Sequence, residues 1–263
     1  MMRGETIFQH FRPDEYQFIE KMTDLVAKAA DTYSLQVTEF LNPREVFILK
    51  SIVGQTELNC FVSSDYYPME YAKVIVAPDY YNCSFLDFQM SLIEITYNAK
   101  FNYLTHSQIM GTLLHHLGIR RTVIGDIFAE SGRAQVMVDR SMAAYLLTNT
   151  AKIAKVTVKL KEISFDKLIR PQQEGEAVDI LVSSMRLDRI IATALNISRS
   201  QVLKLVETDK VKVNYALAAK SSNLLEAGDL VSIRGFGRIT LVKENGLSKN
   251  GKHKLTVNKM IHK

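Results

Sequence analysis

The chain has 263 residues, of which 47% are hydrophobic and 23% are charged. This length suits two or three domains with sizeable cores. No apolar run approaches the ~18 residues of a membrane-spanning helix, and the first residues lack the apolar core of a signal peptide. Only two cysteines occur, Cys60 and Cys83, which argues against a disulfide framework and a structural zinc site. We therefore expect a cytoplasmic protein with reduced thiols and no membrane span.

The N-terminal residues 1–80 have the pattern of a small α/β domain. Phe18 and Met22 recur at helical spacing on one apolar face. Asn42 followed by Pro43 is typical of a helix N-cap and first turn. The elements that we expect are helices over residues 14–30 and 43–54 and strands over residues 57–63 and 71–77.

Residues 81–163 follow a different rhythm, in the order β-α-β-β-α-β. This order is the ferredoxin-like plan, which RNA-recognition motifs also use. It says little about function, because the same fold supports many activities. The expected elements are strands over residues 92–97, 123–128, 134–138 and 156–163, and helices over residues 105–117 and 141–148. Residues 164–184, with Pro171 and Gly175, predict a linker.

Positive charge is concentrated in the remaining C-terminal part. Residues 185–263 hold 15 Lys and Arg against 6 Asp and Glu, a net charge of +9, whereas residues 1–184 hold 18 against 22, a net charge of −4. A basic module favours polyanions, because cations that pair with phosphates release counterions. A solvated basic face would have the same composition, so charge alone does not decide.

The basic module begins with two short predicted helices. Leu187, Ile190 and Ile191 share one face of the first helix and should pack inward. Ser198 and Gln201 form the S-x-x-Q capping box that starts the second helix. Strands over residues 211–214, 230–233 and 253–257 follow, with two arginines around a Gly-Phe-Gly turn. Helix faces and turns together should present one basic surface that contacts phosphates.

These motifs resemble the S4 domain, an RNA-binding module, over residues 185–241. The matching segments are Arg186-Leu187-Asp188, Ser198–Val206, Val211–Asn214 and Asp229–Val231. The competing interpretation is an unrelated basic α+β fragment. The RNA-binding residues that follow from the resemblance and the expected helix faces are Arg186, Asp188, Arg189, Ser198, Arg199, Ser200, Gln201, Lys204, Lys210, Lys212, Asn214, Lys220, Arg234 and Arg238.

S4 domains also occur in several RNA-modifying enzymes, but the catalytic domains and motifs of those enzymes are not found in this sequence. Pseudouridine synthases of this type have a large catalytic domain after the S4 domain, but only 22 residues follow Leu241. Asp188 resembles their catalytic aspartate, yet it lies inside an S4 helix, where capping or pairing with an arginine suits it better. Neither a nucleotide-binding signature nor a methyltransferase Gly-rich loop is visible. An RNA-modifying enzyme with an unrecognised active site in residues 1–163 stays open as the alternative.

The whole layout resembles the YlmH family of bacterial S4-domain proteins. The segment LGIRRTVIGDI, with Arg120, Arg121, Gly125 and Asp126, and the string VMVDR extend the likeness to the middle domain. The resemblance implies an α+β chain with an N-terminal α/β domain (1–80), a ferredoxin-like (RRM-like) domain (81–163), a linker (164–184) and an S4 (αL-type) domain with a basic tail (185–263). It also implies a cytoplasmic RNA-binding protein without catalysis or cofactor, associated with the large ribosomal subunit, with rescue of stalled peptidyl-tRNA complexes and with cell division.

The middle domain departs from the usual RNA-recognition motif. Its expected central strand, residues 134–140, has no aromatic residue for base stacking. If this domain contacts RNA, basic side chains are better candidates than rings; the alternative is a solvated arginine surface. The candidates are Arg120, Arg121, Arg133 and Arg140. Six aromatic residues between Tyr66 and Phe85 suit core packing best, with a domain interface or a partner surface as the alternatives. The expected partners are rRNA or tRNA and a protein partner of the N-terminal domain.

Overall fold

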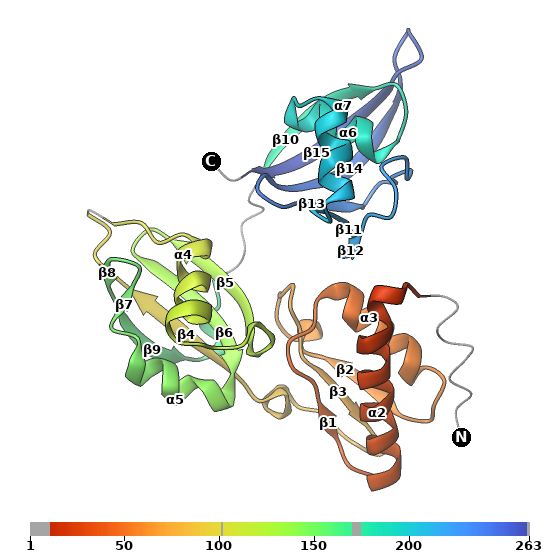
Figure 1. Cartoon of the computed structure of the whole chain (residues 1–263). Helices are drawn as coiled ribbons and strands as arrows, with labels where there is room; N and C mark the ends of the chain where they lie inside the picture. The colour runs from red at the N-terminus through yellow and green to blue at the C-terminus, as the bar shows by residue number, and fades with distance from the viewer. Residues whose placement is uncertain (1–10, 101, 170–174, 262–263) are drawn as a thin grey trace. The chain divides into compact units, whose positions relative to one another are not determined.

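A computed structural model describes residues 11–100, 102–169 and 175–261, and the chain divides into two compact units, Met1–Pro171 and Gln172–Lys263 (Figure 1). We call them the N-terminal unit and the C-terminal unit and describe each by itself. Mixed helix and strand in both units confirms the predicted α+β class.

The first part of the N-terminal unit packs two helices on a small antiparallel sheet. Helix α2 buries Ile19, Met22 and Val26, which recur every three or four residues, and Asn42 caps α3 as predicted. The sheet order is β1-β3-β2. The elements are η1 (Pro13–Glu15), α2 (Tyr16–Thr32), β1 (Gln36–Val37), α3 (Pro43–Val53), β2 (Asn59–Val62), η2 (Ser63–Asp65), β3 (Val74–Ala77) and η3 (Phe85–Phe88).

The second part is a four-stranded antiparallel sheet in the order β5-β6-β4-β9, with helices between β4 and β5 and between β6 and β9. This is the predicted ferredoxin-like plan. The helix predicted over residues 105–117 exists but becomes π-helical in its second half. The elements are β4 (Met90–Thr96), α4 (His106–Gly111), the π-helical η4 (Thr112–His116), η5 (Arg121–Val123), β5 (Ile124–Glu130), β6 (Arg133–Asp139), α5 (Arg140–Asn149), β7 (Lys152–Ile153), β8 (Val156–Thr157), β9 (Lys159–Ile163) and η6 (Phe165–Lys167).

Both faces of this sheet are covered. Ile93 and Ile95 pack in the cluster that includes residues of α4 and α5, whereas Leu92 and Met137 pack on the other side with Phe40 and other residues of the first part. Gln135, fully buried on β6, donates to the Lys167 carbonyl (2.9 Å) and accepts from the Ile169 amide (2.7 Å). The sheet face that stacks bases in an RNA-recognition motif is therefore sealed by the chain itself.

The C-terminal unit is a six-stranded antiparallel sheet with two short helices on one face (Figure 1). The strand order is β10-β15-β14-β13-β11-β12. One hydrophobic cluster joins α6, α7 and the inward side chains of the strands. The elements are β10 (Glu176–Val182), α6 (Leu187–Leu195), α7 (Arg199–Glu207), β11 (Val211–Val213), β12 (Ala216–Leu217), β13 (Leu230–Ile233), β14 (Gly237–Leu247) and β15 (His253–Ile261).

The linker prediction for residues 164–184 is wrong at both ends of the segment. Phe165 at its start is buried in the N-terminal unit. Residues 176–182 form β10, whose Ile180 and Val182 enter the core of the C-terminal unit because the strand pairs with the distant β15. Residues 170–174, with Pro171, lie outside the described residues, as do residues 1–10 and 262–263 of the predicted outer domains.

Candidate nucleic-acid interface

Asp188 holds two arginines at the start of the helix pair α6–α7. It is 4% exposed in the first turn of α6. Arg186 donates to both carboxylate oxygens (Nε to Oδ1 3.0 Å, Nη2 to Oδ2 3.1 Å), and Arg199 donates twice to Oδ2 (Nε 3.1 Å, Nη2 2.6 Å). Burial opposes ionisation of Asp188, but these bonds outweigh it and lower its pKa to about 2. The carboxylate therefore stays charged near neutral pH.

The two guanidinium groups remain accessible although they are held. The side chains of Arg186 and Arg199 are 36% and 52% exposed. Each guanidinium has five N–H donors, and the bonds to Asp188 occupy only part of them. A fixed arginine fork loses less entropy when it binds a phosphate than a freely rotating one. Asp188 is thus a positioning residue, which agrees with the predicted arginine pairing.

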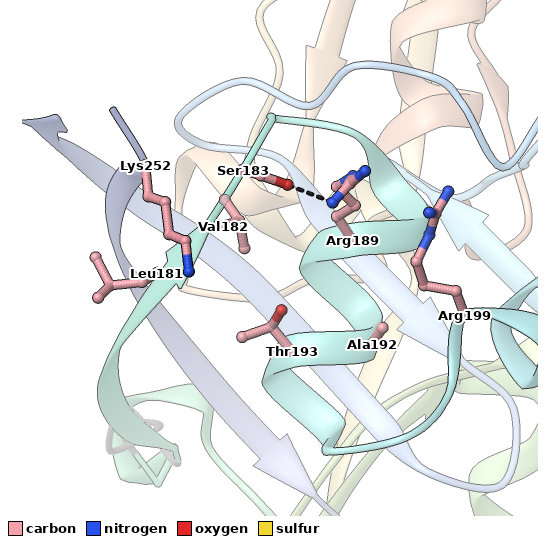
Figure 2. A pocket seen from close by; sticks show the side chains of 8 residues that line it. All are labelled: Leu181, Val182, Ser183, Arg189, Ala192, Thr193, Arg199 and Lys252. Atoms are coloured by element: carbon pink, nitrogen blue, oxygen red, sulfur yellow. Dashed lines mark hydrogen bonds between the residues drawn. The ribbon is translucent and has the colours of Figure 1, made fainter. Parts of the chain in front are cut away.

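A small pocket with three cations lies beside this pair, between β10, α6, α7 and the turn that leads into β15 (Figure 2). Its volume is about 230 Å³. Arg189 donates to the Ser183 hydroxyl, and its Nε is buried with no hydrogen-bond partner among the described residues. Arg199 and Lys252 complete the basic lining, which includes no acidic residue of the described chain. An anion would pair with the cations and could satisfy the buried Nε–H.

The start of α7 follows its sequence signature. Ser198 Oγ accepts from the Gln201 amide (3.2 Å), and Gln201 Oε1 accepts from the Ser198 amide (2.9 Å). The Ser200 hydroxyl lies 2.9 Å from Ser198 Oγ. The capping box is therefore confirmed, and these three side chains already bond locally. Lys204, one turn further along, is exposed.

The strand register divides the predicted basic surface. Val211 and Val231 face the core, so Lys212 and its cross-strand neighbours Ser232 and Arg238 point to the sheet face away from α6 and α7. The single continuous surface expected from the sequence is thus not formed. Lys210, Lys220 and Arg234 are exposed in turns and at strand ends.

Asn214 has a structural part in the turn between β11 and β12. Its φ is +49°, its Nδ2 donates to Asp229 Oδ1 (2.7 Å), and its Oδ1 accepts from the Leu230 amide (2.9 Å). Asparagine tolerates this left-handed conformation better than most residues do. The V-x-V-N signature is therefore explained by the turn without an RNA contact.

The four arginines of the predicted second surface are not gathered into one patch. Arg120 pairs with Glu39 (3.0 Å), and Arg133 pairs with Glu130 (2.8 Å). Arg140, at the start of α5, is exposed and forms no ion pair within the described ranges.

Arg121, the fourth of these arginines, contributes to the contacts between the two parts of the N-terminal unit. Its guanidinium lies 4.1 Å from the centre of the Tyr71 ring and donates to the Ile124 carbonyl. The Asp126 carboxylate accepts hydrogen bonds from the backbone amides of Glu70 (2.6 Å) and Tyr71 (3.0 Å). The residues of the LGIRRTVIGDI segment thus bind one part of the unit to the other.

Sequence reasoning missed three polar residues of the pocket: Ser183, Thr193 and Lys252. The alternation of Val178, Ile180 and Val182 was a usable signal for β10, and hence for Ser183 at its end. Lys252 had no local signal, because it reaches the pocket through the pairing of Val182 with His253.

Other chemistry-bearing groups are few. Within the described ranges, no three His, Cys, Asp or Glu side chains are grouped so that they could hold a metal ion. Cys60 and Cys83 are free thiols, and burial raises the pKa of Cys60 to about 11, which makes it a poor nucleophile. None of the helices in the described part is long and apolar enough to cross a membrane.

Three family models match successive parts of the chain. They are described as "YlmH, N-terminal" (residues 14–81), "Putative RNA-binding domain in YlmH" (84–167) and "S4 domain" (185–231). A curated relative, "Ribosome-associated protein quality control protein P2" of Bacillus subtilis (strain 168), is 32% identical over 250 residues, which cover 95% of this chain and 97% of the relative. The chain belongs to the YlmH family.

A solved structure supports the same placement. "Cell division protein ylmH from Streptococcus pneumoniae" is 35% identical and has a TM-score of 0.56, over 61% of this chain and 98% of that one. The YlmH and S4 resemblances predicted from the sequence are both confirmed. The S4 domain of this chain lies in its C-terminal unit, which also holds the Arg186–Arg199 pair and the three-cation pocket.

Proposed function

We propose that this protein binds structured ribosomal RNA or tRNA through the α6–α7 side of its S4 domain and performs no catalysis. The observation that carries the proposal is the Asp188-held pair of Arg186 and Arg199 beside the three-cation pocket. Cations with fixed positions suit the fixed phosphates of a folded RNA, which is recognised by shape and backbone more than by sequence.

The residues proposed to contact RNA fall into two groups. Arg186, Arg189, Arg199, Lys204 and Lys252 lie on or beside the helix pair and should provide most of the affinity. The sheet-face residues Lys212 and Arg238 contribute only if the RNA reaches round the edge of the sheet. Ser198, Ser200, Gln201 and Asn214 support the surface through their local bonds.

We further propose that the RNA belongs to the large ribosomal subunit, in rescue of stalled peptidyl-tRNA complexes in the cytoplasm. The name of the Bacillus subtilis relative, which refers to ribosome-associated quality control, supports this role. The name of the pneumococcal relative supports a link to cell division, for which the N-terminal unit would provide the protein-binding surface.

Sedimentation tests the proposal. A tagged chain from cell lysate is run through sucrose at two salt concentrations, and the RNA crosslinked to it is sequenced. Salt-sensitive migration with free large subunits, with crosslinks to ribosomal RNA and tRNA, is expected. Absence from every ribosomal fraction together with crosslinks at one RNA site would instead support an RNA-modifying enzyme.

A charge reversal assigns the binding to the proposed face. The double variant Arg199→Glu with Lys204→Glu should lose co-sedimentation. The double variant Lys152→Glu with Lys155→Glu, which changes the net charge equally at exposed sites of the N-terminal unit, should retain it. Equal behaviour of the two variants would show that the α6–α7 side is not the RNA-binding face.

A further inference from the structure

A second pocket lies in the N-terminal unit, at one end of the ferredoxin-like sheet. Strand β9 ends at Ile163, which pairs with Leu92, whereas β4 continues to Met90 along β6. The edge of β4 at Met90 and Ser91 is therefore open to a pocket of about 250 Å³. This is smaller than the ~300 Å³ at which pockets for drug-sized ligands begin, so it suits one small ring system.

Three aromatic rings form one side of this pocket. Tyr67 and Phe85 lie 4.7 Å apart between ring centres, as do Phe85 and Phe165. The rings meet edge to face, and Tyr67 and Phe85 are only half-buried. Such rings stack on flat heteroaromatic ligands whatever the polar pattern at the ligand's edge.

Tyr67 and Ser164 of the pocket both bond to Asp166, whereas three other polar lining residues lack such partners in the described chain. Ser91 is 2% exposed, and its hydroxyl has no hydrogen-bond partner among the described residues. A buried hydroxyl without a partner costs free energy, and by the alternation of β4 this one lies on the face of Ile93, opposite the face on which the three rings pack. Arg140 and Glu162 also line the pocket, are exposed, and form no ion pair with any described residue.

We propose that this pocket binds one unpaired nucleobase of an RNA, with the adjoining phosphate on Arg140. The rings would stack on the base, and Glu162 would accept from its amino group, which favours adenine, cytosine and guanine over uracil. The site also resolves a contradiction in the middle domain, which matches an RNA-binding family model although its stacking face is sealed. It rests on the proposed function only in taking RNA as the ligand.

Nuclear magnetic resonance of the full chain with small probes tests the chemistry. AMP, CMP and GMP should shift the signals of Ser91 and Phe165, UMP should shift them less, and ribose 5-phosphate should leave them unchanged. Shifts confined to residues 185–261, equal shifts with ribose 5-phosphate, or tighter binding of N-acetyltyrosine amide than of AMP would each overturn the proposal. The last result would indicate a pocket for a peptide side chain.

Two variants separate the roles within the pocket. Arg140→Gln should weaken AMP about tenfold and leave adenosine unchanged, since only the phosphate contact is lost. Arg133→Gln, an equal charge change at an arginine paired with Glu130, is the control and should change neither. An equal loss for AMP and adenosine would contradict the assigned phosphate contact.

A crosslinking arm distinguishes RNA from a free nucleotide. An RNA that carries 6-thioguanosine should crosslink to peptides containing Phe85 or Phe165, and mononucleotide binding without any such crosslink would overturn the assignment to RNA. The variant Arg199→Glu with Lys204→Glu should leave the AMP shifts unchanged. In that variant, retained ribosome binding would contradict the α6–α7 face, whereas lost AMP shifts would contradict the pocket, so the two proposals fail separately.

Discussion

The two units differ in which member of an acid–base ion pair is buried and which is exposed. In the C-terminal unit, Asp188 is buried and its two arginines remain exposed, so the acid orients cations toward solvent. In the N-terminal unit, Lys73 is itself buried and pairs with Asp139 (Nζ to Oδ2 2.6 Å), so the acid holds the cation away from solvent. The comparison teaches that a count of basic residues locates an RNA-binding face only when their partners are known.

The largest effect is expected at the buried pair of the N-terminal unit. Asp139→Asn keeps a side chain that can cap α5 but removes the counter-charge of Lys73, whose side chain is 3% exposed. Leaving a buried charge unpaired costs about 3–5 kcal/mol in unfolding free energy, measurable by denaturant titration. Lys21→Ala, which breaks the exposed pair with Glu39, is the control and should cost less than ~1 kcal/mol. Equal losses would mean that Lys73 is not effectively buried.

The corresponding change in the C-terminal unit is Asp188→Asn. Removing a negative charge should by itself improve RNA binding, so a positioning role predicts the opposite sign. We expect RNA affinity to fall by about tenfold, equivalent to ~1.4 kcal/mol, because both arginines are released. Asp179→Asn makes the same charge change on β10 and should not weaken binding. Tighter binding by Asp188→Asn, measured by filter retention at fixed salt, would contradict the positioning role.

The Asp188 carboxylate should also make the unfolding free energy depend on pH in acid. Its folded pKa of about 2 lies below the ~3.9 of an unfolded aspartate, so its contribution is present above pH ~4 and is lost as the pH falls toward 2. This contribution is on the order of 2 kcal/mol. The unfolding free energy of the wild-type chain should therefore fall more steeply between pH 4 and 2 than that of Asp188→Asn. Parallel curves would show that the arginines do not stabilise the ionised form.

The smallest expected effect compares the salt dependence of RNA binding for basic residues on the two faces of the C-terminal sheet. Lys252→Gln should reduce the slope of log affinity against log salt by about one, as expected for one lost phosphate contact. Lys212→Gln, on the opposite sheet face, should reduce it less. A larger change for Lys212→Gln would place the RNA on the outer face of the sheet.

Local signals in the sequence predicted the local structure well. The Ser198–Gln201 capping box, the Asn42 cap and the order of the ferredoxin-like elements depend on neighbours within a few residues, and all are present. The S4 helices were placed for the same reason, since their apolar spacing and caps are short-range patterns.

Long-range pairing accounts for what the sequence did not reveal. β10 follows the polar residues 171–175, and its partner β15 lies far along the chain, with Glu176 paired to Lys259, 83 residues later. The roles of Arg120 and Arg121 depend on Glu39 and Tyr71, which no periodicity connects to them. Which sheet face Lys212 occupies also required the register with Ser232 and Arg238.

The pairing of β10 with β15 has a consequence for synthesis of the chain. The three-cation pocket combines Ser183, at the end of the first strand of the unit, with Lys252, just before the last strand. Chains emerge from the ribosome N-terminus first, so a nascent chain that already contains both S4 helices still lacks this side of the pocket. The proposed RNA-binding pocket is therefore completed only after β15 has been synthesised and has paired with β10.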